Sequence, residues 1–115
     1  MARLLTTRRI INFFIVKVIQ DANHHAGNVE YIIQPLANAI LNRMNFPTDT
    51  LEVWDRNGNI GRTCWVTING NRYALSYDYN KQVINLRHRS IQGNIIFSFD
   101  NNTSPQVIRR IVGGL

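Results

Sequence analysis

The stretch that decides the fold runs from Arg62 to Tyr79 and reads RTCWVTINGNRYALSYDY. Its centre, Asn69-Gly70, is the strongest short-range signal for a β-hairpin, because type I′ turns need positive φ angles that Asn and Gly tolerate. Residues that favour strands, mainly aromatic and β-branched ones, dominate on both sides of this turn. The stretch therefore predicts two antiparallel strands joined by a tight turn.

Two further turns divide the chain that follows. Asn80-Lys81 and Gln92-Gly93-Asn94 each lie between short runs rich in Ile, Val, Tyr and Phe. Strands are expected near residues 51–54, 62–68, 72–79, 82–90 and 94–100, with each strand paired to the next along the chain. The pattern predicts an antiparallel meander of four to five strands.

Turn lengths also predict the register, and the register decides which side chains share a face. A loop at Asn69-Gly70 pairs Val66 with Tyr73, and a loop at Gln92-Gly93 pairs Leu86 with Phe99. The three hairpins agree on one apolar face, which is expected to be the core: Cys64, Val66, Ile68, Tyr73, Leu75, Tyr77, Ile84, Leu86, Ile95, Phe97 and Phe99.

The opposite face of this sheet is expected to meet solvent. Its two predicted rows are Trp65, Ala74, Arg87, Ser98 and Thr67, Arg72, Arg89, Ile96. An aromatic ring beside several arginines is typical of surfaces that bind single-stranded nucleic acid, because bases stack on the ring and arginines hold phosphates. Trp65, Arg72, Arg87 and Arg89 are therefore the candidate anion-binding or nucleic-acid-binding residues. Alternatively, this face is an ordinary solvated surface, or Trp65 packs under a loop, under the C-terminal helix or in a dimer interface.

Apolar residues at three- and four-residue spacing predict a helix before the meander, capped by Thr6 or Thr7 and running to about His24. Phe13 and Val16 fall on its polar side. Either this helix is buried on two sides, or these two residues contact a second subunit.

A second helix is expected after a break at residues 25–28, and it should run to about Met44 with a kink at Pro35. A helix that starts at Pro35 is the alternative. Near the end of the chain, Ser104 is placed as an N-cap and Pro105 at the first helical position, which predicts a short C-terminal helix.

These elements together predict a single α+β domain over residues 1–115. An N-terminal helical hairpin packs on one face of the four- to five-stranded antiparallel meander, and the short C-terminal helix completes the layer. The length is sufficient for a core that needs no disulfide or metal.

Composition narrows the class of protein. Hydrophobic residues make up 44% of the chain and charged residues 17%, which is typical of a globular protein. The net charge of +6 favours an acidic partner such as RNA, single-stranded DNA or an acidic protein. With one cysteine, no signal peptide and no membrane-length apolar segment, the chain is expected in the cytoplasm. Small basic proteins of this kind are frequent on phage and on mobile gene cassettes.

Catalytic and metal-binding patterns are weak. Asp21, His24, His25 and Glu30 are close in sequence, but their spacing matches no zinc motif, and neither a metal nor a cofactor is expected. His88 is predicted on the core face, opposite to Arg87 and Arg89 along the strand. Only a bulge would gather those three residues into a ribonuclease-like site.

The sequence thus favours a non-enzymatic binding or interaction protein, expected to be a homo-oligomer. Its sheet face would bind nucleic acid or another anionic partner. A small ribonuclease or toxin-like enzyme is the alternative, and a structural homo-oligomer without a ligand is another.

Overall fold

The structure is a computed structural model that describes residues 2–5, 7, 9–12, 15–16, 18–19, 29, 31–45, 48–56 and 59–115. Its centre is a six-stranded antiparallel sheet in which each strand pairs with its neighbour in sequence order. The strands are β1 (Ala2–Leu5), β2 (Thr50–Arg56), β3 (Asn59–Ile68), β4 (Asn71–Asp78), β5 (Val83–His88) and β6 (Ile95–Phe99). The predicted meander and the α+β class are confirmed.

Strand β1 is an addition to the prediction, because the first residues were not expected to form a strand. It pairs antiparallel with β2 over Ala2 to Leu5, so it forms one edge of the sheet. Four residues are too few to show an alternating pattern, and the partner strand lies far along the chain. Nothing local in the sequence therefore indicated β1.

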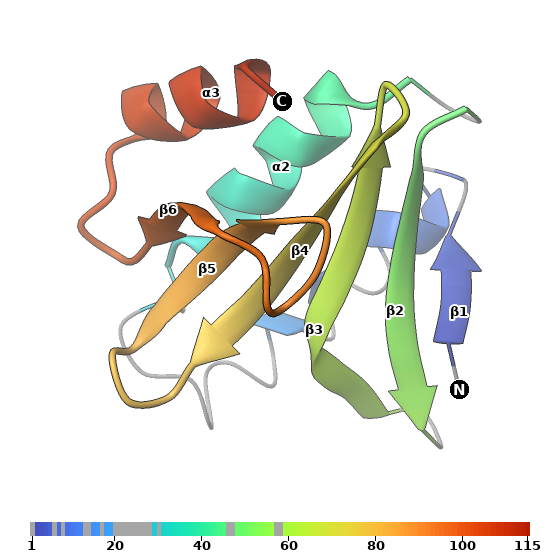
Figure 1. The fold of residues 1–115 in the computed structure, drawn as a ribbon, viewed down its shortest axis with the longest axis horizontal. Helices are drawn as coiled ribbons and strands as arrows, with labels where there is room; N and C mark the ends of the chain where they lie inside the picture. The colour runs from blue at the N-terminus through green and yellow to red at the C-terminus, as the bar shows by residue number, and fades with distance from the viewer. Residues whose placement is uncertain are drawn as a thin grey trace.

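Helices cover one side of the sheet. In Figure 1, α2 (Ile33–Arg43) lies behind the strands, and α3 (Pro105–Gly113) lies alongside α2. The side of the sheet that faces the viewer carries neither helix. The core lies between these layers and includes buried residues of both: Ile33, Leu36, Ile40 and Leu41 from α2, Ile108 and Val112 from α3, and Val66, Ile68, Leu75, Leu86 and Phe99 from the strands.

The predicted N-terminal helical hairpin is not among the elements of the described residues. Residues 9–12, 15–16 and 18–19 have helical backbone, and Thr7 accepts a hydrogen bond from the Ile10 N–H at 3.4 Å, as expected of a cap. Thr6, Phe13 and the break at residues 25–28 lie outside the described residues.

The second arm of that hairpin was predicted incorrectly. Helix α2 begins at Ile33, and Pro35 therefore lies in its first turn, where a missing N–H costs no helical hydrogen bond. No kink is needed there, and the alternative of a helix that starts near Pro35 is closer to the structure. Before α2, the Val29 carbonyl accepts hydrogen bonds from the Ile32 and Ile33 N–H groups.

Two of the three hairpin registers are confirmed. Val66 pairs with Tyr73, Tyr77 pairs with Ile84, and Asn69 and Gly70 have φ angles of 53° and 82°, as a type I′ turn requires. The C-terminal helix is also confirmed. The Ser104 hydroxyl accepts a hydrogen bond from the Val107 N–H at 3.2 Å, and Pro105 occupies the first turn.

The third register was wrong by two residues. Leu86 pairs with Phe97 rather than Phe99, and a bulge then brings Ile95 opposite Arg87. The loop between β5 and β6 is longer than a two-residue turn, and Ile96 is the extra residue of the bulge. Ile95, which was expected in the core, is consequently 48% exposed.

A buried carboxylate holds the β3–β4 turn. Asp49, which is only 2% exposed, accepts hydrogen bonds from the N–H groups of Asn69 at 2.9 Å and Asn45 at 2.8 Å. The connection from α2 to β2 is thereby fixed against the turn that sets the sheet register. No pattern in the sequence singled out this residue.

Replacement of Asp49 with Ala should lower the free energy of unfolding by about 1–3 kcal/mol, because two part-buried N–H groups lose their acceptor. Asp49→Asn, which keeps one acceptor oxygen, should lose less. Urea denaturation followed by circular dichroism measures both effects. Equal midpoints for wild type and Asp49→Ala would contradict the role of this carboxylate.

Candidate anion-binding face

The candidate site lies on the face of the sheet opposite α2, called here the outer face. It is defined by Glu52, Trp65, Ala74, Arg87 and Ile95, which are paired across the strands in one row, and by Arg72 and Arg89 beside that row. The strand alternation places the side chains of this row and of Arg72 on the side that α2 leaves open. Figure 1 shows this side toward the viewer. Arg89 follows the last residue of β5.

Trp65 and Arg72 form the centre of the outer face. The Arg72 guanidinium lies over the Trp65 ring, 5.5 Å from its centroid, in a cation–π contact. The guanidinium also donates to the Glu52 carboxylate at 3.4 Å, while 49% of the Arg72 side chain is exposed. The Arg72 guanidinium therefore contacts Trp65 and Glu52, and the remainder of the side chain is exposed to solvent.

Arg87 has a structural partner. It was predicted to face the solvent beside Trp65, and it does lie in the same row, next to Ala74. Its guanidinium donates to the Gly93 carbonyl at 2.9 Å, and the side chain is half-buried. Arg87 thus fastens the β5–β6 loop and presents less charge than the sequence indicated.

Arg89 lies just past the end of β5, where its backbone adjoins Arg72. Its N–H donates to the Arg72 carbonyl at 2.9 Å, so the two residues are neighbours, as predicted. Arg89 is exposed and has a φ of 71°, a backbone conformation that a non-glycine residue rarely adopts. The structure therefore brings together Trp65, Arg72 and Arg89, while Arg87 takes part through the loop that it holds.

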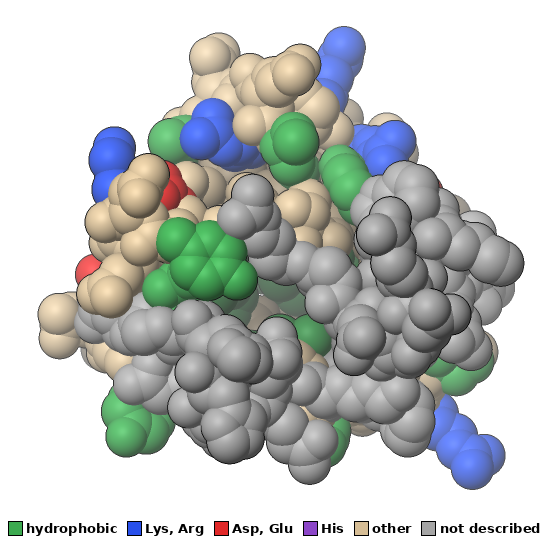
Figure 2. All heavy atoms as spheres, turned by 90° about the horizontal axis from the view of Figure 1, so that it is seen from below, with side chains coloured by type: hydrophobic (Ala, Val, Ile, Leu, Met, Phe, Trp, Pro, Cys, Tyr) green, Lys and Arg blue, Asp and Glu red, His purple; other side chains and the backbone are tan. Residues whose placement is uncertain are grey.

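Seen from below, the basic side chains that the structure describes do not gather into one patch. Figure 2 shows Lys and Arg side chains spaced around the rim, separated by polar atoms and hydrophobic side chains. On α3, Arg109 and Arg110 are exposed, and Arg43 donates to the Leu115 carbonyl at 2.6 Å. Among the described side chains, local geometry rather than a concentration of charge distinguishes the outer face.

His88 lies on the other face from Arg87. It pairs with Tyr73, and the two rings meet edge to face at 5.9 Å, as the predicted register implied. His88 is exposed at the end of β5, not buried, and Phe97 is paired with Leu86 instead. The bulge near this point adds its residue to β6, so strand alternation still separates His88 from Arg87.

Cys64 is held in its neutral form. Burial against the core raises the pKa of its thiol from 9.0 to about 12. A thiol with so high a pKa carries almost no thiolate at neutral pH and is a poor nucleophile.

Metal ligands do not cluster in the described part of the chain. There, no group of three His, Cys, Asp or Glu side chains lies in position to hold a metal ion. The sequence cluster of Asp21, His24, His25 and Glu30 lies outside the described residues, so the structure does not test it. Within the same described part, no helix is long and apolar enough to cross a membrane.

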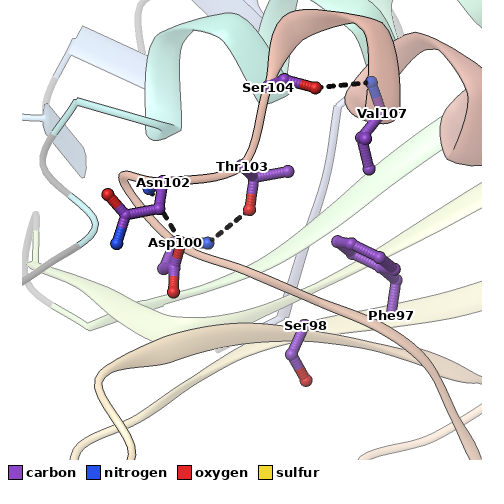
Figure 3. A pocket seen from close by; sticks show the side chains of 7 residues that line it. All are labelled: Phe97, Ser98, Asp100, Asn102, Thr103, Ser104 and Val107. Carbon is purple, nitrogen blue, oxygen red and sulfur yellow. Dashed lines mark hydrogen bonds between the residues drawn. The ribbon is translucent and has the colours of Figure 1, made fainter.

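A shallow hollow of about 340 Å³ lies between β6 and the start of α3 (Figure 3). Its lining residues are Phe97, Ser98, Asp100, Asn102, Thr103, Ser104 and Val107. The polar groups here largely satisfy one another: Thr103 accepts from the Asp100 N–H, and Asp100 accepts from the Asn102 N–H. Such self-contained bonding stabilises the connection into α3 and provides little for a ligand.

The structure, which holds one chain, does not test the suggested oligomer contacts. Val16 is 53% exposed, which agrees with a residue on the polar side of its helix. Phe13 lies outside the described residues. A second subunit at this surface stays a prediction.

Comparison with known proteins gives one match to a protein family. The model of the family described as "Integron cassette protein VCH_CASS1 chain" matches residues 11–109. No curated protein matches the chain. The family match agrees with the expectation of a protein carried on a mobile gene cassette.

The neutral thiol of Cys64 gives a direct test of its burial. At pH 8, a pKa near 12 instead of 9.0 lowers the thiolate fraction about a thousandfold. Native protein should therefore react with iodoacetamide about a thousand times more slowly than protein unfolded in guanidinium, as followed by mass spectrometry. Similar rates in the two states would show that Cys64 is accessible and ionisable, and Cys64→Ser is the unlabelled control.

Proposed function

The chain belongs to the integron cassette protein family described above, and we propose that it is a non-enzymatic binding protein that contacts an anionic partner through its outer face. The observation that carries this proposal is the position of Arg72. Its guanidinium, on the side of the sheet opposite α2, is stacked over Trp65 and half exposed, and its backbone carbonyl accepts a hydrogen bond from the N–H of the exposed Arg89.

The arrangement suits an anion because Arg72 is oriented before binding. The Trp65 ring supports the guanidinium from one side, which reduces the conformational entropy that a free arginine loses on binding. Arg89 adds a second exposed cation at the neighbouring strand end. A carboxylate or phosphate bound by Arg72 would therefore have a second exposed arginine nearby.

Glu52 competes with such a ligand only weakly. Its contact with Arg72 is long, at 3.4 Å, and both side chains are partly exposed. Ion pairs of this kind contribute about 0–1 kcal/mol, and salt screens them further. An incoming anion can displace Glu52 at small cost, and Glu52 holds Arg72 in place until then.

The non-enzymatic character is supported by what the described residues offer. Cys64 is neutral, and Arg87 is occupied by the Gly93 carbonyl on the face opposite His88. A ribonuclease-like site would need His88 and the arginines on one side of the sheet. The alternation of β5 places His88 and Arg87 on opposite sides.

Neutralising the outer face should weaken binding to polyanions. Arg72→Gln/Arg89→Gln should lower the affinity for oligo(dT), oligo(U) and poly-L-glutamate by about tenfold or more, and should flatten the dependence of the affinity on salt. Fluorescence anisotropy over a salt series measures both quantities. The expected loss follows from removing two cations that meet one ligand.

Arg109→Gln/Arg110→Gln is the matched control, because it removes the same charge from exposed positions on α3. Its affinity should stay close to that of the wild type. Equal losses in the two double variants would mean that only net charge matters, and the outer face would then have no special role.

A further inference from the structure

The β5–β6 loop, Arg89–Asn94, is held by a dense set of backbone hydrogen bonds. The His88 N–H donates to the Asn94 carbonyl at 3.1 Å, and the Ser90 N–H donates to the His88 carbonyl at 2.9 Å. The Gly93 N–H donates to the Ser90 carbonyl at 2.9 Å, and the Gln92 N–H donates to the Ser90 hydroxyl at 3.2 Å. The loop is therefore closed on itself.

Two further contacts fasten this loop to the sheet. Arg87 donates to the Gly93 carbonyl at 2.9 Å, and the Arg89 N–H reaches the Arg72 carbonyl at 2.9 Å. At Gly93 a Cβ atom would lie 1.9 Å from the His88 carbonyl oxygen, so only glycine fits there. The loop has one conformation that the sheet and its own sequence specify together.

This fixed loop displays aliphatic side chains. Ile91 in the loop is 51% exposed, and Ile95 and Ile96 at the start of β6 are 48% and 40% exposed. These three isoleucines lie within six residues of the chain, and exposed apolar side chains that lie together mark interaction sites. A preorganised apolar surface also loses little conformational entropy on binding.

The neighbouring charges indicate the kind of partner. Ile95 pairs with Arg87 on the outer face, and Arg72 and Arg89 are exposed close to the same end of the sheet. An apolar centre with an arginine rim fits a protein that carries aliphatic and acidic side chains. A second copy of this chain is disfavoured, because each copy carries a net charge of +6 and the same arginines.

Nucleic acid fits this surface less well. Aliphatic side chains offer no ring for a base to stack on, and the Trp65 ring is already covered on one side by Arg72 at 5.5 Å.

We infer that the β5–β6 loop and the adjoining outer face form a preorganised docking surface for an acidic protein segment with aliphatic side chains. This inference rests on the proposed function, because Arg72 and Arg89 supply the rim in both. It adds that Ile91 and Ile95 supply the apolar centre and that Gly93 keeps them in place.

Two synthetic peptides test the inference. They have equal length and equal glutamate content, and the remaining positions are leucine in one and serine in the other. The wild-type protein should bind the leucine peptide about tenfold more tightly or better by isothermal titration calorimetry. Ile91→Asn/Ile95→Asn should remove this preference, whereas Val16→Asn, at a similarly exposed position, should keep it.

Gly93→Ala tests preorganisation separately, since it leaves every isoleucine in the sequence. Binding of the leucine peptide should weaken severalfold, and binding of the serine peptide should change little. Circular dichroism and urea denaturation establish that each variant is folded. An unchanged leucine preference in Gly93→Ala would overturn the role of the fixed loop.

The outcomes separate the two proposals. Equal affinity for both peptides, lost in Arg72→Gln/Arg89→Gln, overturns the aliphatic docking surface and leaves the proposed function standing. Oligonucleotides that bind more tightly than the leucine peptide have the same consequence and identify nucleic acid as the partner. Peptide affinities that do not depend on Arg72 and Arg89 overturn the proposed function itself.

Discussion

The turn at Asn69-Gly70 is the constraint on which the rest of the molecule depends. Two consecutive positive φ angles close β3 onto β4 with one register, and strand alternation then assigns every side chain of the central strands to a face. The buried carboxylate of Asp49 binds the first N–H of this turn, so the helical layer and the sheet are connected at the same point. Without that register, Trp65 and Arg72 would have no fixed neighbours.

The sequence was sufficient to predict the parts of the fold and of the site that short turns control. The pairs across β3, β4 and β5 follow from turn residues, and so does the gathering of Trp65, Arg72 and Arg89. The β5–β6 register was not predictable in the same way. Its loop closes through backbone hydrogen bonds and through the close packing of Gly93 against the His88 carbonyl. Residue types alone do not specify these contacts.

The arginines show why a count of charges overstates a binding surface. Arg87 and Arg89 are separated by one residue, yet Arg87 donates to a carbonyl of its own chain and Arg89 is exposed. A guanidinium has several donors in a planar group, so it serves equally well as a backbone clamp or as a ligand contact. Which role it takes depends on the loop beside it. The sequence predicted where the charges lie, but not whether each guanidinium already has a hydrogen-bond partner within the chain.

Strand β1 has a consequence for the order in which the sheet forms. The strands from β2 to β6 can pair through short connections, but β1 reaches β2 only after residues 6–49 have closed a long loop. Loop closure of this length costs roughly 3 kcal/mol of chain entropy before any β1 contact is made. The edge at β1 should therefore assemble late and open first, so the two margins of one continuous sheet differ in kinetic stability.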